Sequence, residues 1–258
     1  MIIVERSGVT LAIKQLDHAA LAGRFAAEWG NDRFQAPEPR DAVLLAAARH
    51  DEGWREWDDE QRQDPERGRL LNFLDVGIED YVELYARGIR RIADLDPYAG
   101  VLVSMHGTGN VCGRWGTQRG IRLSHYDEDT WPPVIRRYVL EQERLQSELK
   151  LDLIGLNPSV RRSVFERGLW ANYELLQAWD RLSLFLCRAD REAGAQADLG
   201  SVPTAREGGE TEALSVSSSA GSATVRPWPF GRREFEVEIP VQSGPGPLRW
   251  TLREETAA

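Results

Sequence analysis

Histidine and aspartate residues at five positions are the side chains of this chain that could do chemistry together. The doublet His50-Asp51 ends an alanine-rich apolar run, and His18, His106 and Asp180 also lie among apolar residues. Imidazole nitrogens and carboxylate oxygens can bind divalent transition-metal ions and can also transfer protons. The doublet is therefore either a polar helix end or a pair of metal ligands.

Helical spacing places these side chains on apolar stripes that should face a core. The apolar neighbours three, four or seven positions away are Leu21, Ala22 and Phe25 for His18; Val43, Ala46, Ala47 and Trp54 for His50; Ala99, Leu102 and Val103 for His106; and Tyr173, Leu176, Leu184 and Cys187 for Asp180. A lone buried histidine is usually a hydrogen-bonded core residue, and a lone buried carboxylate must become neutral or find a cation. Three imidazoles and two carboxylates would each need a separate partner, whereas one divalent ion satisfies them together. The set therefore favours a shared metal ion over independent burial.

Helices must position these residues. The periodicity of the apolar residues predicts helices at residues 15–31, 41–54, 78–95, 97–106, 134–150 and 168–188. Asp41 is a good N-cap, and Asp96-Pro97 combines an N-cap with proline at the first helical position. A glycine-rich loop over residues 107–129 carries His125 and could be a lid or a plain connector.

Short strands are expected at both ends of the chain. Residues 1–13 contain two apolar runs on either side of Arg6-Ser7-Gly8, which predicts a β-hairpin. Residues 191–224 are rich in small and polar residues and poor in large apolar ones, so a flexible linker or excursion is predicted there. Residues 225–258 contain short alternating runs, which predict a C-terminal β segment that packs on the helical domain.

Composition narrows the classes of function. A formal net charge of −9 over 258 residues disfavours a nucleic-acid binder, because phosphate neutralisation needs clustered Lys and Arg. No stretch approaches the roughly 20 apolar residues that span a bilayer. With two cysteines and no secretory pattern at the start, a cytoplasmic protein is expected. The segments outside the helical region could serve a partner or homo-oligomerisation.

The order of the candidate residues resembles the HD-domain superfamily of metal-dependent hydrolases, in which H…HD…D residues from a helical core bind a divalent ion. The resemblance implies that His18, the His50-Asp51 doublet and Asp180 hold one ion. This mixture of imidazole and carboxylate ligands suits Mn, Fe, Ni, Co or Zn better than Ca. His106 would be a further ligand, which would open a second metal position, or an acid near the leaving group.

A closer resemblance covers nearly the whole chain. The segments QLDHAALAGRFAAEWG, RHDEGWREWD, LDPYAGVLVSMHG and PWPF together are similar to a bacterial family of unknown function, domain-of-unknown-function family 3891. The resemblance to that family does not indicate a substrate. Together the two resemblances imply a mainly α fold, with an HD-domain-like helical bundle over residues 14–190 and small β elements from the N-terminal hairpin and the C-terminal strands.

The function expected from these residues is that of a metal-dependent hydrolase acting on a nucleotide or another small, anionic, phosphorylated compound. Water activated by the metal would be the nucleophile, and Asp51, His106 and Glu52 are the catalytic candidates. For Glu52 the sequence favours a solvated acid at a helix end over a role in the site, and for His125 it favours an exposed loop residue. Two alternatives stay open. A di-iron oxygenase of the HD type would need His106 and His125 to complete six ligands, and a non-catalytic module would bind a small molecule or a partner.

Overall fold

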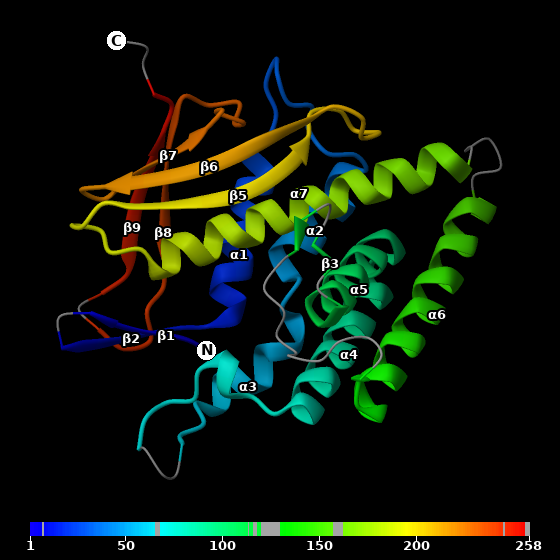
Figure 1. Ribbon diagram of the computed structural model, residues 1–258, viewed down its shortest axis with the longest axis horizontal. Coiled ribbons are helices and arrows are strands. Elements are labelled where there is room, and N and C mark those ends of the chain that lie inside the picture. The colour runs from blue at the N-terminus through cyan, green and yellow to red at the C-terminus, as the bar shows by residue number, and fades with distance from the viewer. Residues whose placement is uncertain are drawn as a thin grey trace.

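The computed structural model describes residues 1–6, 8–64, 68–112, 114–115, 118–119, 130–156, 162–244 and 246–255. Helices gather beside a five-stranded sheet (Figure 1). The helices are α1 (Gln15–Glu28), α2 (Arg40–Arg49), the short η1 (Glu52–Trp54), α3 (Arg55–Glu60), the short η2 (Phe73–Asp75), α4 (Ile78–Leu95), α5 (Pro97–Cys112), α6 (Pro133–Leu156) and α7 (Arg162–Arg188). The strands are β1 (Ile2–Arg6), β2 (Val9–Ile13), β3 (Arg114–Trp115), β4 (Gln118–Arg119), β5 (Ala195–Pro203), β6 (Thr211–Ser219), β7 (Ser222–Arg226), β8 (Glu234–Ile239) and β9 (Leu248–Arg253). Strands β1 and β2 pair antiparallel as the expected N-terminal hairpin.

The five-stranded sheet makes the expectation of a mainly α bundle with small β elements wrong. Its strands follow the order β5-β6-β7-β9-β8, in which β7 and β9 are parallel and the other neighbours are antiparallel. The sheet packs on α7, where the indole N–H of Trp250 in β9 donates a hydrogen bond of 3.1 Å to the carbonyl oxygen of Leu186. The fold is therefore α+β, with helices packed against a mixed sheet.

Residues 191–224 contain two strands of nine residues each, β5 and β6, where the sequence predicted a flexible linker. In β6 alternate side chains are buried, namely Leu214, Val216 and Ser218, and the side chains between them are more exposed. A strand with one solvated face needs few large apolar residues. The low average hydrophobicity of this segment therefore concealed a period of two, and the linker prediction is wrong.

Helix α5 continues six residues beyond His106, where the sequence predicted its end. Glycine is a poor helix former, but Gly107 lies where α5 packs closely against other helices. A Cβ at this position would lie 2.5 Å from the Tyr138 hydroxyl oxygen and 3.1 Å from Cδ1 of Tyr85. Tertiary packing thus overrides the local propensity. The extension places Asn110 one turn after His106, on the same side of α5.

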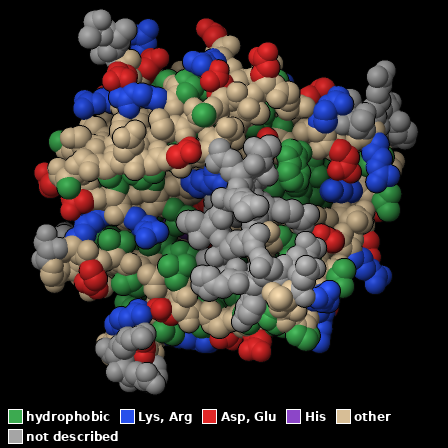
Figure 2. All heavy atoms as spheres, viewed as in Figure 1, with side chains coloured by type: hydrophobic (Ala, Val, Ile, Leu, Met, Phe, Trp, Pro, Cys, Tyr) green, Lys and Arg blue, Asp and Glu red, His purple; other side chains and the backbone are tan. Residues whose placement is uncertain are grey.

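On the face shown in Figure 2, acidic and basic side chains are interspersed around the apolar ones. Of the described helices, none combines the length and apolar character needed to cross a membrane.

A candidate metal centre

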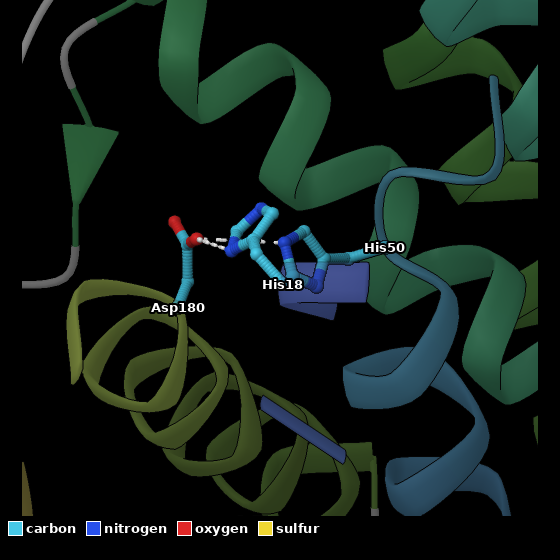
Figure 3. A group of neighbouring side chains, drawn as sticks. All are labelled: His18, His50 and Asp180. Carbon is cyan, nitrogen blue, oxygen red and sulfur yellow. Dashed lines mark ion pairs between the residues drawn. The ribbon is translucent and has the colours of Figure 1, made fainter. Parts of the chain in front are cut away.

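The five residues selected from the sequence as metal ligands meet at one buried place. His18 lies on α1, His50 and Asp51 follow directly after α2, His106 lies on α5, and Asp180 lies on α7. Each of them is at most 3% exposed. Figure 3 shows the carboxylate of Asp180 pointing from α7 toward the imidazole rings of His18 and His50.

Each of the two carboxylates faces two imidazoles within 4 Å. Nε2 of His18 is 2.8 Å from Oδ2 of Asp51, and Nε2 of His50 is 3.8 Å from the same oxygen. Oδ1 of Asp180 is 3.4 Å from Nε2 of His50 and 3.7 Å from Nδ1 of His18. The rings of His50 and His106 pack edge to face, with centroids 4.8 Å apart. The imidazoles and carboxylates therefore form one continuous cluster.

Hydrogen bonds to the outer ring nitrogens set which nitrogen of each histidine is free for a cation. Ser183 donates its hydroxyl hydrogen to the carbonyl oxygen of Asp180 at 2.7 Å, so it accepts from Nδ1–H of His18 at 2.8 Å. Nδ1–H of His50 donates to the carbonyl oxygen of Ala47 at 2.9 Å. Both histidines therefore direct Nε2 toward a carboxylate. Without a cation this nitrogen carries a hydrogen, which His18 donates to Asp51, and its lone pair would be offered to a bound ion, as in metal-binding histidines whose second nitrogen is held by another group.

The separations between these atoms suit ligands of a single ion. Two atoms that each lie about 2.1 Å from a tetrahedral ion are about 3.4 Å apart, close to the distances between Nε2 of His50 and the two carboxylates. Ligand atoms of His18, His50 and Asp180 lie within 4.8 Å of one another, as do those of His50, Asp51 and His106. Nε2 of His50 is buried and makes no well-aligned hydrogen bond within the described part of the chain. The donor set thus fits a divalent transition-metal ion.

Charge interactions in the cluster shift the pKa of its members strongly. Burial disfavours the charged form of His50, but Asp51 and Asp180 outweigh burial and raise the pKa of His50 to about 9. Burial also favours the neutral form of each acid, yet His50 and His18 hold the pKa of Asp51 and that of Asp180 below the usual range. A bound cation would take the place of the proton on His50, because both compete for the same lone pair.

His106 differs from His50 in charge. Burial, together with the positive charge of His50, lowers the pKa of His106 to about 4. The side-chain amide of Asn110 lies 3.1 Å from Nε2 of His106, and its N–H donates to that nitrogen. His106 is therefore neutral at neutral pH, and its ring is oriented by a neighbour on the same helix.

A pocket opens over the cluster. Its cavity volume is about 90 Å³, which is room for a few water molecules or a compact group of a ligand. His18, Asp51, His106 and Asp180 line it from the cluster, and the other lining residues are Gln15, Phe73, Leu74, Tyr85, Asn110, Leu184 and Arg188. A small molecule in this pocket would contact both carboxylates and two of the imidazoles.

Glu52, a catalytic candidate from the sequence, is not brought to this pocket. The carboxylate of Glu52 accepts hydrogen bonds from Nε of Arg49 at 2.9 Å and from Nε of Arg55 at 2.8 Å, and Glu52 is not part of the pocket lining. Its side chain is thus occupied by arginines, and nothing places it against a ligand. His125 lies outside the described residues.

Sequence reasoning missed three residues that hold the cluster in place. Tyr85 donates a hydrogen bond of 2.7 Å from its hydroxyl group to Oδ1 of Asp51, and Ser183 and Asn110 contact histidines as described above. Ser183 lies three residues after Asp180 and Asn110 four after His106, so helical spacing could have indicated both once the helices were drawn to their full lengths. No comparable signal marked Tyr85, because it lies on a different helix from Asp51.

Comparison with known proteins gives a family without an assigned activity. A family model described as "Protein of unknown function (DUF3891)" matches residues 1–243. No curated protein and no solved structure matches the chain. The matched region includes every residue of the cluster and most of the five-stranded sheet.

Proposed function

The chain belongs to the DUF3891 family, and we propose that this member is a metal-dependent hydrolase of the HD type, acting on a nucleotide or another small phosphorylated compound. The observation that carries the proposal is the orientation of His18 and His50. Both hold Nδ1 in a hydrogen bond to an outer acceptor in a buried cluster, where Nε2 of His18 faces Asp51 and Nε2 of His50 faces both Asp180 and Asp51.

The ligands would be His18, His50, Asp51 and Asp180, and the ion Mn, Fe, Ni, Co or Zn. When bound, such an ion supplies Lewis acidity toward a water molecule and a phosphoryl oxygen. The chain itself contributes the fixed positions of the ligands. Tyr85 holds one oxygen of Asp51 and leaves the other directed at the histidines. The hydrogen bond from the uncharged Tyr85 hydroxyl group thus holds the Asp51 carboxylate in one orientation and adds no charge to the site.

His106 would act as a neutral group that faces the substrate. Its lowered pKa, about 4, leaves little imidazolium at neutral pH, and a nearby cation would lower it further. Donation of an imidazolium proton to a leaving group is therefore disfavoured. Because Nε2 accepts from Asn110, Nδ1 carries the ring hydrogen, so the roles that fit are a hydrogen-bond donor through Nδ1–H or, in the other tautomer, a further imidazole ligand. Glu52 receives no role, because Arg49 and Arg55 hold its carboxylate.

Elemental analysis of the purified chain tests the proposal. The wild-type protein should carry one exchangeable divalent ion per chain, and His50→Ala and Asp180→Ala should lose it while retaining helical circular dichroism. Glu174→Ala is a matched control, because Glu174 is a buried acid on the same helix that bonds Trp170 and does not line the pocket. If both site variants keep the wild-type metal content, the assigned ligands are wrong.

The same measurement separates the other functions considered for this chain. Two irons per chain would favour a di-iron oxygenase, and the absence of metal at every pH would favour a module that only binds a ligand or partner. One ion per chain, together with hydrolysis of para-nitrophenyl phosphate or a nucleotide in the presence of Mn or Ni, supports the hydrolase.

A further inference from the structure

We propose that Arg188 is the anion-binding residue of this pocket and that the pocket selects a phosphomonoester with an apolar body. The inference deepens the proposed function and rests on it, because the ligand would occupy the pocket above the metal centre.

One side of α7 leads from the cluster to the mouth of the pocket. Asp180, Leu184 and Arg188 recur every four residues, and all three line the pocket. With a rise of 1.5 Å per residue, the backbone of Arg188 lies about 12 Å along the helix from that of Asp180. Long side chains on a helix lean toward its N-terminus, which here is toward Asp180. The guanidinium group can therefore reach a ligand bound at the cluster.

The charge of Arg188 is not used by its surroundings. The side chain is exposed and makes no ion pair or hydrogen bond with any described residue. Two other arginines of α7 are engaged: Arg181 donates to the carbonyl oxygen of Leu199, and Arg167 pairs with Glu207. Among the described lining residues, Arg188 is also the sole Lys or Arg. A guanidinium group beside a cavity is well suited to bind phosphate through two parallel hydrogen bonds.

An ordinary explanation exists for a basic residue in the last turn of a helix, since it interacts favourably with the helix dipole. That explanation accounts for a small contribution to stability. It does not account for the rest of the pocket wall, where Leu74 is 56% exposed and lies with Phe73 and Leu184 around the same cavity. Apolar surface beside an unused cation is complementary to a ligand that has an apolar body and an anionic group.

Gln15 is a second polar group in the pocket that a ligand could satisfy. The residue is 3% exposed, and its Oε1 is buried without a hydrogen-bond partner in the part of the chain that the structure describes. Gln15 precedes His18 by one helical turn and lines the pocket with it. Because an unsatisfied buried oxygen is costly, a hydroxyl group or a water molecule that accompanies the ligand would stabilise this position.

The test is titration calorimetry of the full-length, Mn-loaded protein with phenylphosphonate, a probe whose C–P bond resists hydrolysis. Arg188→Gln should weaken binding by about tenfold or more, as expected for loss of a charge-assisted hydrogen bond, and Arg188→Lys should recover part of it. Arg167→Gln, an exposed arginine of the same helix outside the pocket, should bind as the wild type does. Methylphosphonate should bind more weakly than phenylphosphonate, because it lacks the apolar body.

Equal affinity of Arg188→Gln and wild type would overturn the inference, and so would a wild-type protein that does not bind phenylphosphonate at millimolar concentration. Thermal melting of each variant distinguishes a role of Arg188 in helix stability from a role in binding. A role in stability alone would change the melting temperature and leave phenylphosphonate affinity unchanged. Hydrolysis of para-nitrophenyl phosphate is measured independently. If phenylphosphonate binding depends on Arg188 but para-nitrophenyl phosphate is not hydrolysed, only the hydrolase proposal is contradicted. If the substrate is hydrolysed but binding does not depend on Arg188, only the inference about Arg188 is contradicted.

Discussion

The hydroxyl group of Tyr85 donates a hydrogen bond of 2.7 Å to Oδ1 of Asp51, while Oδ2 of the same carboxylate lies 2.8 Å from Nε2 of His18. The two oxygens of one acid are thus divided between an uncharged partner on α4 and the histidine cluster. Tyr85 is buried, and burial with the nearby charge of Asp51 raises the pKa of its hydroxyl well above the ordinary value. It therefore remains a hydrogen-bond donor throughout the working pH range.

Removing this donor should weaken metal binding without abolishing it. Tyr85→Phe leaves the ligand set complete but lets the Asp51 carboxylate rotate, and loss of such an outer hydrogen bond typically costs about 10- to 100-fold in metal affinity. Competition for Mn or Co with a chelator of known affinity measures the change. Tyr98→Phe is the control, because Tyr98 is a buried tyrosine that bonds Asn172 away from the pocket. An unchanged affinity in Tyr85→Phe would show that Asp51 needs no support or is not a ligand.

Metal affinity should rise with pH up to about 9. In the metal-free protein the pKa of His50 is raised to about 9, so at pH 7 an incoming ion must displace the proton from that ring. The apparent affinity should then increase by about tenfold per pH unit between pH 6.5 and 8.5 for one displaced proton. Calorimetry in buffers of different ionisation enthalpy counts the protons released. Release of no proton would exclude His50 as a ligand.

Close backbone contact between η1 and α4 fixes the segment that follows the His50-Asp51 doublet. A Cβ on Gly53 would lie 2.0 Å from the carbonyl oxygen of Leu84, the residue before Tyr85. Gly53→Ala should therefore force the two backbones apart and reduce the free energy of unfolding by at least about 2 kcal/mol. Metal affinity should fall as well, because the pairing of Tyr85 with Asp51 depends on this contact.

Urea denaturation measures the first effect, and Gly155→Ala provides the comparison. Gly155 is a helical glycine with open space where a Cβ would be added. Replacement by alanine there should stabilise the protein by about 0.5–1 kcal/mol. Equal effects of the two substitutions would show that the segment after the doublet is not tightly packed.

The candidate ligands were accessible from the sequence, because burial of a helical residue follows from its neighbours three and four positions away. Asp180 shows this clearly: Leu176 and Leu184 lie on its stripe, and the structure buries it. The pairing of His18 with Asp51 could not be predicted in this way, because no local pattern relates two residues that are 33 positions apart in the sequence. Their convergence was expected from the resemblance to the HD-domain superfamily.

The errors had identifiable physical causes. The sheet was missed where its strands alternate small polar residues with a few apolar ones, so that composition resembled a linker although Leu214 and Val216 alternate correctly for a strand. The end of α5 was placed too early because Gly107 lowers helix propensity, whereas its missing side chain allows contact with Tyr138. Asn110 was therefore not recognised as a neighbour of His106, because it lies in the part of α5 that was predicted to be a loop. Local propensity was overruled in α5 by packing between helices.

In the metal-free protein, stability should fall as the pH rises from about 6.5 to 9. The pKa of His50 is raised from 6.5 to about 9, so below pH 6.5 its ring is protonated in both folded and unfolded chains and the stabilisation by Asp51 and Asp180 is complete. Between these values the unfolded chain has lost the proton and the folded chain retains it. Stability therefore declines, and the full difference corresponds to about 3 kcal/mol.

Asp51, Asp180 and His106 do not titrate in this window. The pKa values of Asp51 and Asp180 are lowered, so their contribution is present above about pH 4 and is lost only as the pH falls through the folded values. His106, with a pKa lowered to about 4, is neutral in both states above its ordinary value of 6.5. Urea denaturation in chelator at pH 6.5 and 9.5, compared between wild type and His50→Gln, therefore measures the contribution of His50. His50→Gln should lose much of this pH dependence, and a profile parallel to that of the wild type would mean that the imidazole of His50 is not held between the two carboxylates.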